Sequence, residues 1–174
     1  LAEWHDLNAT RVAREWVNGE SFLYLGSSYR LSLVDNQDEA LKLKDGRFQL
    51  LRSVVEQGDH GAAQRAFEAF YTEKGLSRIQ HRVAHFAPKV GVCAGAVQVK
   101  DLGYRWANCA ANGDMSFHWK CLMAPLTVID YIVVHELVHL LERNHTERFT
   151  SLMDQHLPSW RARRELLNSS PLAN

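Results

Sequence analysis

The chain has 174 residues, 46% of them hydrophobic and 23% charged, so it is long enough to bury a core as one globular domain. Its 20 basic and 20 acidic residues cancel, and this balance gives no strong signal for nucleic acid or an anionic membrane as a partner. No run approaches the roughly 20 apolar residues that span a bilayer, and the three cysteines lack C-x-x-C spacing, so we expect a cytoplasmic protein without a disulfide framework.

The first 57 residues are expected to form a helix and two hairpins. Residues 2–17 carry apolar side chains among charges and suit an amphipathic helix. Alternating residues around a Gly-Ser-Ser turn predict a hairpin over 22–34, and Asp45-Gly46 predicts a second over 40–51. We expect these strands to form a small antiparallel sheet.

A long helical stretch follows over residues 58–86, and Gly75 could bend or break it. His81 and His85 lie four residues apart on it and form a second candidate metal pair. No glutamate separates them and no third ligand is near in sequence, so solvated or capping histidines are the preferred interpretation. The buried side is predicted to consist of Ala63, Ala66, Phe67, Phe70, Ile79, Val83 and Phe86.

Two further strands are predicted over residues 97–100 and 115–121, joined through Arg105-Trp-Ala-Asn-Cys. Alternation in the second strand places Phe117, Trp119 and Cys121 toward the core. His118 and Lys120 then lie on the opposite face, where they could reach a substrate.

The strongest functional signal is H-E-x-x-H over residues 135–139, inside an apolar helix that begins after Pro125. His135 and His139 are four residues apart, so they project from one face of the helix about one turn apart. This spacing also occurs by chance. Here, however, apolar residues cover the opposite face of the helix. Burial of two histidines and a carboxylate costs free energy unless these groups find partners, which favours a functional role.

A catalytic zinc usually takes three protein ligands and leaves one position open, so a third ligand is required. His145 is the best candidate, provided that the chain turns before it. Asn144 could adopt the left-handed conformation that ends helices, and Thr146 could cap the next helix. Glu142 is a weaker candidate, because a continuous helix would place it about 10 Å from His135 along the axis. A closing helix with a basic face is predicted after Pro158.

Glu136 directly follows the first histidine and could accept a proton from water during hydrolysis. Candidate donors for the developing oxyanion are Arg105, His118 and Lys120, each of which could instead be an ordinary surface charge. Asp154 and Glu147 could orient the ring nitrogens of the histidines that do not bind metal.

These motifs, in this order, resemble the YgjP-like family of metal-dependent hydrolases, which is related to the SprT-like and WLM zinc peptidases. The likeness rests on Asn18-Gly-Glu-Ser-Phe-Leu-Tyr-Leu-Gly, Arg105-Trp-Ala-Asn-Cys, Phe117-His-Trp-Lys, Ala124-Pro, the segment Ile129–His139 and Asn144-His. The resemblance implies a zincin-like α+β domain with zinc held by His135, His139 and His145, and Glu136 as the general base. It also implies that related chains begin further upstream.

This chain departs from the family pattern on the substrate side. The family commonly shows Arg-Trp-Gly-Ser-Cys where this chain has Arg105-Trp-Ala-Asn-Cys, and Asn-Trp-Arg where it has His118-Trp-Lys. We interpret Arg105, His118, Trp119 and Lys120 as candidate substrate-binding residues.

The predicted architecture is one zincin-like α+β domain over residues 1–174, with a helix and hairpins in 1–57 and the metal-site core in 58–174. The favoured function is a zinc-dependent metallopeptidase acting on peptides or unfolded polypeptides. One alternative is a metal-dependent nucleotide phosphohydrolase with Arg78, Arg82, Arg105 and Lys120 as phosphate partners. Another is a non-catalytic interaction module with structural zinc. The sequence predicts no oligomeric state.

Overall fold

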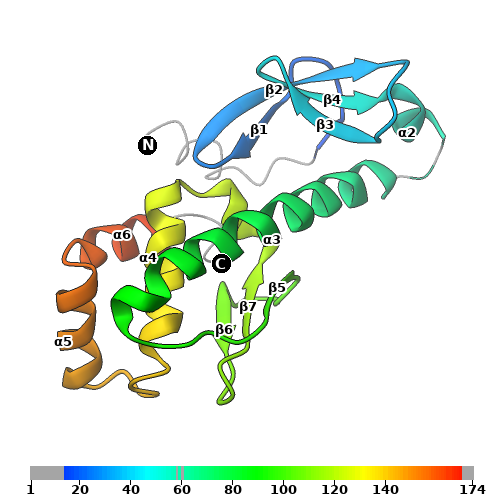
Figure 1. Ribbon diagram of the computed structural model, residues 1–174. Coiled ribbons are helices and arrows are strands. Elements are labelled where there is room, and N and C mark those ends of the chain that lie inside the picture. The colour runs from blue at the N-terminus through cyan, green and yellow to red at the C-terminus, as the bar shows by residue number, and fades with distance from the viewer. Residues whose placement is uncertain (1–13, 58, 60, 170–174) are drawn as a thin grey trace.

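The computed structural model describes residues 14–57, 59 and 61–169, and Figure 1 shows a small sheet at one end of a body built from helices and a second sheet. Residues 14–17 are not helical, and the remainder of the predicted N-terminal helix lies outside the described residues. The first sheet contains β1 (Ser21–Tyr24), β2 (Ser27–Val34), β3 (Leu41–Lys44) and β4 (Arg47–Leu51).

Both predicted hairpins are confirmed, since β1 pairs antiparallel with β2 and β3 with β4. The sheet order is β1-β2-β4-β3, however, and the central pair β2 and β4 is parallel. The sheet is therefore mixed, and the prediction of an antiparallel sheet is wrong at its centre. In this order Leu31 lies beside Phe48 in the register, and both side chains are fully buried.

The long helix α3 (Ala62–Val90) follows the short α2 (Arg52–Glu56) and runs beneath the first sheet toward the second (Figure 1). Aromatic rings fill the space between the first sheet and α3, and Phe22 stacks on Phe67 at 4.3 Å between ring centroids. The Tyr71 hydroxyl donates a hydrogen bond to the carbonyl of Leu23 and joins the helix to β1.

Gly75 does not end α3, which continues past it. A β-carbon at this position would come within 2.6 Å of Cδ2 of Leu122, a fully buried residue of the 3₁₀ helix η1 (Trp119–Met123). The glycine therefore allows α3 and η1 to approach closely.

The second sheet has the order β5-β7-β6, formed by β5 (Val97–Lys100), β6 (Ala107–Cys109) and β7 (Met115–His118). β7 is parallel to β5 and antiparallel to β6. The strand predicted over 115–121 is correct up to His118, after which the chain turns into η1. Phe117, Trp119 and Cys121 are buried as predicted, but His118 is buried as well, with 3% of its surface exposed.

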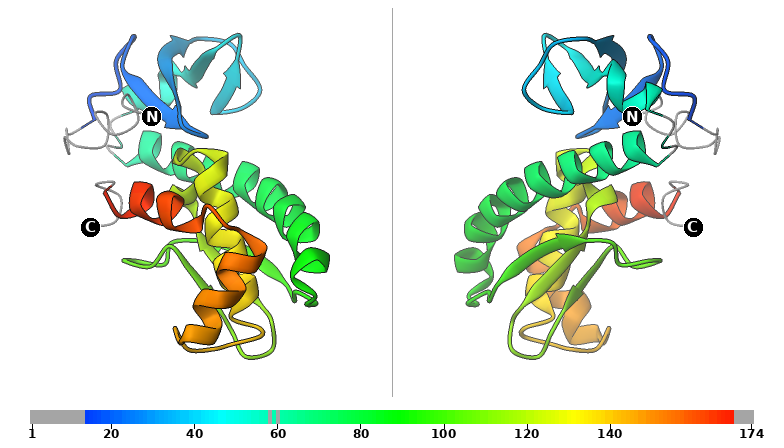
Figure 2. Two further views of the ribbon diagram at one scale, coloured as in Figure 1. Left: turned by 90° about the vertical axis from the view of Figure 1, so that its left-hand side faces the viewer. Right: turned by 90° about the vertical axis from the view of Figure 1, so that its right-hand side faces the viewer.

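The helix α4 (Leu126–Val138) lies at the centre of the body, against α3 on one side and α5 (Glu147–His156) and α6 (Trp160–Asn168) on the other (Figure 2). A bidentate ion pair joins α3 to α4, with Arg82 Nε 2.7 Å from Asp130 Oδ1 and Arg82 Nη2 2.9 Å from Asp130 Oδ2. The α+β class and the packing of the H-E-x-x-H helix against the long helix are confirmed.

The turn between β1 and β2 connects the first sheet to the rest of the molecule. The Leu25 and Gly26 amides donate to the carbonyls of Leu122 and Met123 at 2.7 and 2.9 Å. Gly26 has a φ of 81°, and a β-carbon there would lie 2.9 Å from Cγ of Pro125. Among the helices that the structure describes, none is both long and apolar enough to cross a membrane.

Candidate metal centre

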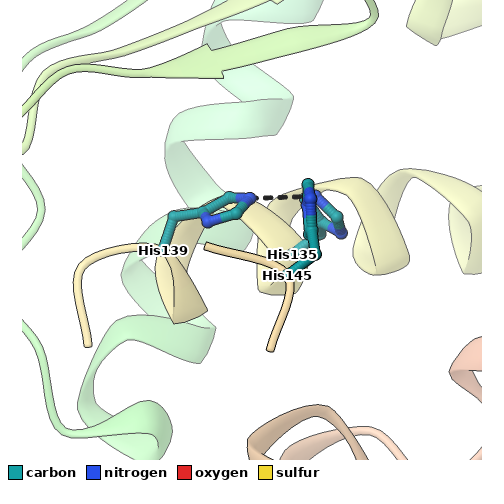
Figure 3. A group of neighbouring side chains, drawn as sticks. All are labelled: His135, His139 and His145. Atoms are coloured by element: carbon teal, nitrogen blue, oxygen red, sulfur yellow. Dashed lines mark hydrogen bonds between the residues drawn. The ribbon is translucent and has the colours of Figure 1, made fainter. Parts of the chain in front are cut away.

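Three histidine rings meet at the C-terminal end of α4. His135 lies in the last turn of the helix and His139 directly follows Val138, so one turn separates them. Their Nε2 atoms are 3.1 Å apart, and Nε2 of His145 lies 3.3 Å from that of His135. Figure 3 shows the rings turned toward one another, with His145 arriving from the segment beyond the helix.

The chain turns between His139 and His145, as predicted, but by a different local structure. The Leu140 and Leu141 amides bond to the carbonyls of Leu137 and Val138, three residues back, which tightens the end of the helix. Asn144 does not adopt a positive φ, so the predicted left-handed turn is wrong at this residue. The helix ends instead in tight turns, in which each amide bonds to the carbonyl three residues back. No residue therefore needs the left-handed conformation there.

The predicted cap of α5 is confirmed. The Thr146 hydroxyl accepts a hydrogen bond from the Phe149 amide at 3.3 Å, at the first turn of the helix. This cap holds the start of α5 directly after His145, and so restricts where the third imidazole can lie.

A backbone carbonyl orients one of the imidazoles. Nδ1 of His139 lies 3.2 Å from the carbonyl oxygen of Glu142. A carbonyl only accepts hydrogen bonds, so Nδ1 must carry the proton and Nε2 keeps a free lone pair facing the other two rings. Glu142 thus acts through its backbone. Asp154, predicted for this role, instead accepts from Trp160 Nε1 at 2.8 Å.

One aromatic side chain supports the whole cluster. The ring centroid of Phe149 lies 5.0 Å from that of His135, 4.7 Å from His139 and 4.9 Å from His145. Phe149 is buried and four residues beyond His145. The sequence analysis missed this contact, although the spacing from His145 on a capped helix was a signal for it.

Burial keeps two of the imidazoles neutral. Loss of solvent, together with the neighbouring rings of His139 and His145, lowers the pKa of His135 to about 3. Burial also lowers the pKa of His139. Neutral imidazole is the form that binds a metal ion, so these rings are ready to act as ligands at neutral pH.

The spacing of the nitrogens fits a tetrahedral zinc ion. Zinc binds imidazole nitrogen at about 2.0–2.1 Å, so two such ligands on a tetrahedral ion lie about 3.4 Å apart. The measured separations of 3.1 and 3.3 Å are close to this value, and the three ligand atoms all lie within 4.8 Å of one another. Within the part of the chain that the structure describes, no other group of three or more metal-binding side chains occurs.

Glu136, which directly follows His135 on α4, is buried, with 7% of its surface exposed. Its carboxylate makes no hydrogen bond within the described residues. Its oxygens nevertheless keep some contact with solvent, because in that part of the chain the one fully buried side-chain oxygen or nitrogen without a partner is Oε1 of Gln37. Burial raises the pKa of Glu136 to about 7, against the opposing charge of Arg143. A carboxyl group that titrates near neutral pH is suited to accept and return a proton.

Arg143 connects this centre to the edge of the second sheet. Its Nη2 donates to the carbonyl of Cys109 on β6 at 3.5 Å, and its charge lowers the pKa of both Glu136 and His139. β6 is an edge strand of this sheet and packs against α4, the helix that carries His135 and Glu136. Sequence reasoning missed Arg143, because nothing in its neighbourhood along the chain indicates a contact with β6.

The predicted substrate-binding residues make no direct contact with the histidines in the described part of the chain. In the described part of the chain no hydrogen bond, ion pair or ring contact joins Arg105, His118, Trp119 or Lys120 to the cluster. His118 is buried and its Nδ1 accepts from the Lys120 amide at 3.0 Å, while Trp119 stacks on Tyr71. Both residues therefore contribute to packing.

The second candidate histidine pair does not form a metal cluster. His85 Nε2 lies 3.0 Å from the ammonium group of Lys89, and its ring packs against Phe86. His81 lies in a separate cavity on α3. The interpretation of both as ordinary histidines stays a prediction.

A helix with two histidines and a buried carboxylate, joined by a third imidazole beyond a turn, defines the class of metal-dependent hydrolases. Residues 1–170 match the sequence model of the YgjP-like family, described as a metallopeptidase domain. The chain belongs to this family, which confirms the resemblance seen in the sequence. It is therefore a metallopeptidase-type hydrolase, and its family implies a bound metal ion.

One solved structure is similar in part. The crystal structure of the metallopeptidase zymogen of Pyrococcus abyssi abylysin aligns with a TM-score of 0.49 and 18% sequence identity, over 52% of this chain and 92% of that chain. No curated protein sequence matches the chain significantly.

Proposed function

We propose that this protein is a zinc-dependent peptidase in which His135, His139 and His145 hold the metal and Glu136 is the general base. The observation that carries the proposal is the convergence of three Nε2 atoms at zinc-ligand spacing. The next residue after His135 on α4 is Glu136, whose buried carboxylate has no hydrogen-bonding partner in the described residues. A structural zinc site would need four closed ligands and would have no use for Glu136, which disfavours a non-catalytic module.

When bound, zinc would supply Lewis acidity, which polarises a substrate carbonyl and makes water a nucleophile at neutral pH. The Glu136 carboxylate would accept the proton that water loses and pass it to the leaving amine. His139 is held by its Nδ1 bond to the Glu142 carbonyl, so its Nε2 points at the metal position without reorganisation.

A peptide substrate is favoured by the edge strand. β7 lies between β5 and β6, so both of its edges are paired. β6 has one strand neighbour within the described residues, and an extended peptide could pair with its outer edge. Arg143 bonds to the Cys109 carbonyl on this strand and its charge lowers the pKa of Glu136, so its guanidinium could stabilise the oxyanion of the substrate.

The test is the Glu136→Gln substitution in the zinc-loaded protein, assayed on an unfolded polypeptide and on nucleoside triphosphates. We expect turnover of the polypeptide to fall by about 10²–10⁴-fold, because the proton acceptor is lost, while zinc content measured by elemental analysis is unchanged. Glu165→Gln, at an exposed position of α6, is the matched control and should retain activity. Equal activity of parent and Glu136→Gln would reject the assigned role, and hydrolysis of nucleotides alone would reject peptidase function.

A further inference from the structure

Positive charge is concentrated on a face of α3 that the proposed peptidase chemistry does not use. From Lys74 to Val90 the helix carries two lysines, two arginines and two histidines, but no carboxylate. The whole chain has no formal net charge, so the positive charge of this segment is balanced by acidic residues elsewhere in the sequence.

Three of these cations line one cavity of about 550 Å³. Lys74, Arg78 and Arg82 follow one another at four-residue intervals, so their side chains leave one face of α3 about 6 Å apart along the axis. Tyr24 of β1 and Leu126 in the first turn of α4 complete the wall. The cavity thus lies where the first sheet, α3 and α4 meet, and its volume is in the range of small-molecule sites.

The guanidinium groups in this cavity are held in place. Arg82 makes the bidentate ion pair with Asp130, which is only 8% exposed, so its charge is balanced and its position is fixed. Arg78 Nε donates to the Tyr24 hydroxyl at 3.3 Å, which leaves its two terminal nitrogens for a ligand. Lys74 forms no ion pair within the described residues. Two positive charges therefore remain without a counter-charge in the lining.

Further hydrogen-bonding groups lie between the cations. The Ser77 hydroxyl and the His81 imidazole belong to the same lining, and both residues are exposed. An adjoining cavity of about 440 Å³ shares Lys74 and Arg78 but also contains Glu73, so its charge is mixed. The basic cavity, in contrast, has no carboxylate in its lining.

We propose that this cavity binds the phosphate group of a small phosphorylated molecule. Phosphate offers several oxygens and up to two negative charges, and a guanidinium fork together with an ammonium group matches this pattern. A single carboxylate of an acidic peptide would use only part of these donors. Leu126 supplies an exposed apolar surface against which the organic part of a phosphate ester could pack.

The proposed phosphate site is separate from the histidine cluster. Leu126 precedes His135 by nine residues on α4, which corresponds to about 13 Å along the helix axis. Arg105 and Lys120, which the nucleotide hypothesis grouped with Arg78 and Arg82, do not line the cavity. A phosphate held here would therefore bind without being hydrolysed at the metal centre, and the inference does not depend on peptidase activity.

The probes are inorganic phosphate and adenosine monophosphate, titrated by calorimetry into the full chain at constant ionic strength. We expect saturable binding that weakens about tenfold or more in Arg78→Gln and in Lys74→Gln, since each removes a charged hydrogen bond. Arg105→Gln and Lys100→Gln are the matched controls, since each removes one positive charge of the same kind from outside the cavity. Both variants should bind the two probes as the parent does. Unfolding midpoints without ligand show whether each variant is folded.

The results separate the alternatives. Tighter binding of the monophosphate than of phosphate, lost in the cavity variants, supports a phosphate ester, and equal binding of the two supports the inorganic ion in the same site. No saturable binding by the parent, or equal weakening in all four variants, would overturn the proposal. A hexaglutamate peptide that binds more tightly than either probe through Arg78 would overturn it in favour of an acidic polypeptide.

Discussion

Single atoms decide whether the three imidazoles can share one ion. His135 and His139 are placed by helical spacing, whereas His145 depends on the turn after α4 and on the cap at Thr146. The Glu142 carbonyl fixes the tautomer of His139, and Phe149 contacts all three rings. The centre is thus supported by groups that bind no metal themselves, a common arrangement in metal sites.

At this scale, removal of the third imidazole should cost metal binding. We expect His145→Ala to lower the zinc content of the purified protein well below one equivalent, because two ligands on one helix hold the ion weakly. Elemental analysis measures this, and His156→Ala, on α5, is the control. Full zinc content in His145→Ala would show that another group provides the third ligand.

His118 should make the stability of the metal-free protein depend on pH. Burial lowers the pKa of His118, against Asp101 and Glu68, which raise it, and together with Lys120, which lowers it. A folded-state pKa below the unfolded value means that the unfolded chain binds the extra proton more readily. The contribution is therefore complete above about pH 6.5 and is lost as the pH falls through the folded-state pKa.

The comparison uses His118→Asn, which keeps an acceptor for the Lys120 amide but does not titrate. Denaturant unfolding of both proteins in chelator, from pH 7.5 to pH 5, gives the difference in free energy of unfolding. We expect the parent to lose stability more steeply than the variant as the pH falls, by at most about 1.4 kcal/mol per pH unit. Parallel curves would contradict the assignment.

At the scale of elements, close approach of α3 and η1 determines how the helical layer packs. Gly75 leaves room for Leu122, and the ion pair of Arg82 with Asp130 joins the same long helix to α4. α3 therefore positions both the segment after β7 and the helix that carries the metal ligands. Its interior glycine has a packing function, not that of a helix break.

Gly75→Ala tests this packing. Alanine in a helix interior is ordinarily favoured over glycine by about 1 kcal/mol, but here its β-carbon would meet the buried Leu122 at 2.6 Å. We expect a net loss of about 1–3 kcal/mol in the free energy of unfolding, measured with urea. Gln80→Ala, at an exposed position of α3, should change it by less than about 0.5 kcal/mol. A variant as stable as the parent would show that the two elements can separate freely.

At the scale of the whole molecule, the metal position bridges α4 and the start of α5, while the first sheet is attached through the Leu25-Gly26 turn and the aromatic layer on α3. The histidines come from segments that only the folded chain brings together. Any ion bound there should therefore stabilise the fold as well as the site.

Addition of zinc to the metal-free protein should raise its unfolding temperature, and a chelator should reverse the change. At a zinc concentration 100 times the dissociation constant the gain is about 2.7 kcal/mol. Differential scanning calorimetry measures the shift, and His145→Ala should respond much less than the parent. An unfolding temperature that changes with neither zinc nor chelator would show that the histidine cluster does not hold the ion in the folded state.

Local sequence patterns were enough to predict both hairpins, the long helix, the H-E-x-x-H helix, the cap at Thr146 and the three histidines that come together. Each depends on residues that are close in the chain: side-chain periodicity, turn chemistry and the spacing of four residues within a helix. Long-range packing set the other features: the parallel pairing of β2 with β4, the burial of His118, the edge position of β6 and the contacts of Phe149 and Arg143. These features depend on which surfaces meet across the fold, and a local pattern carries no information about the partner that a side chain will find there.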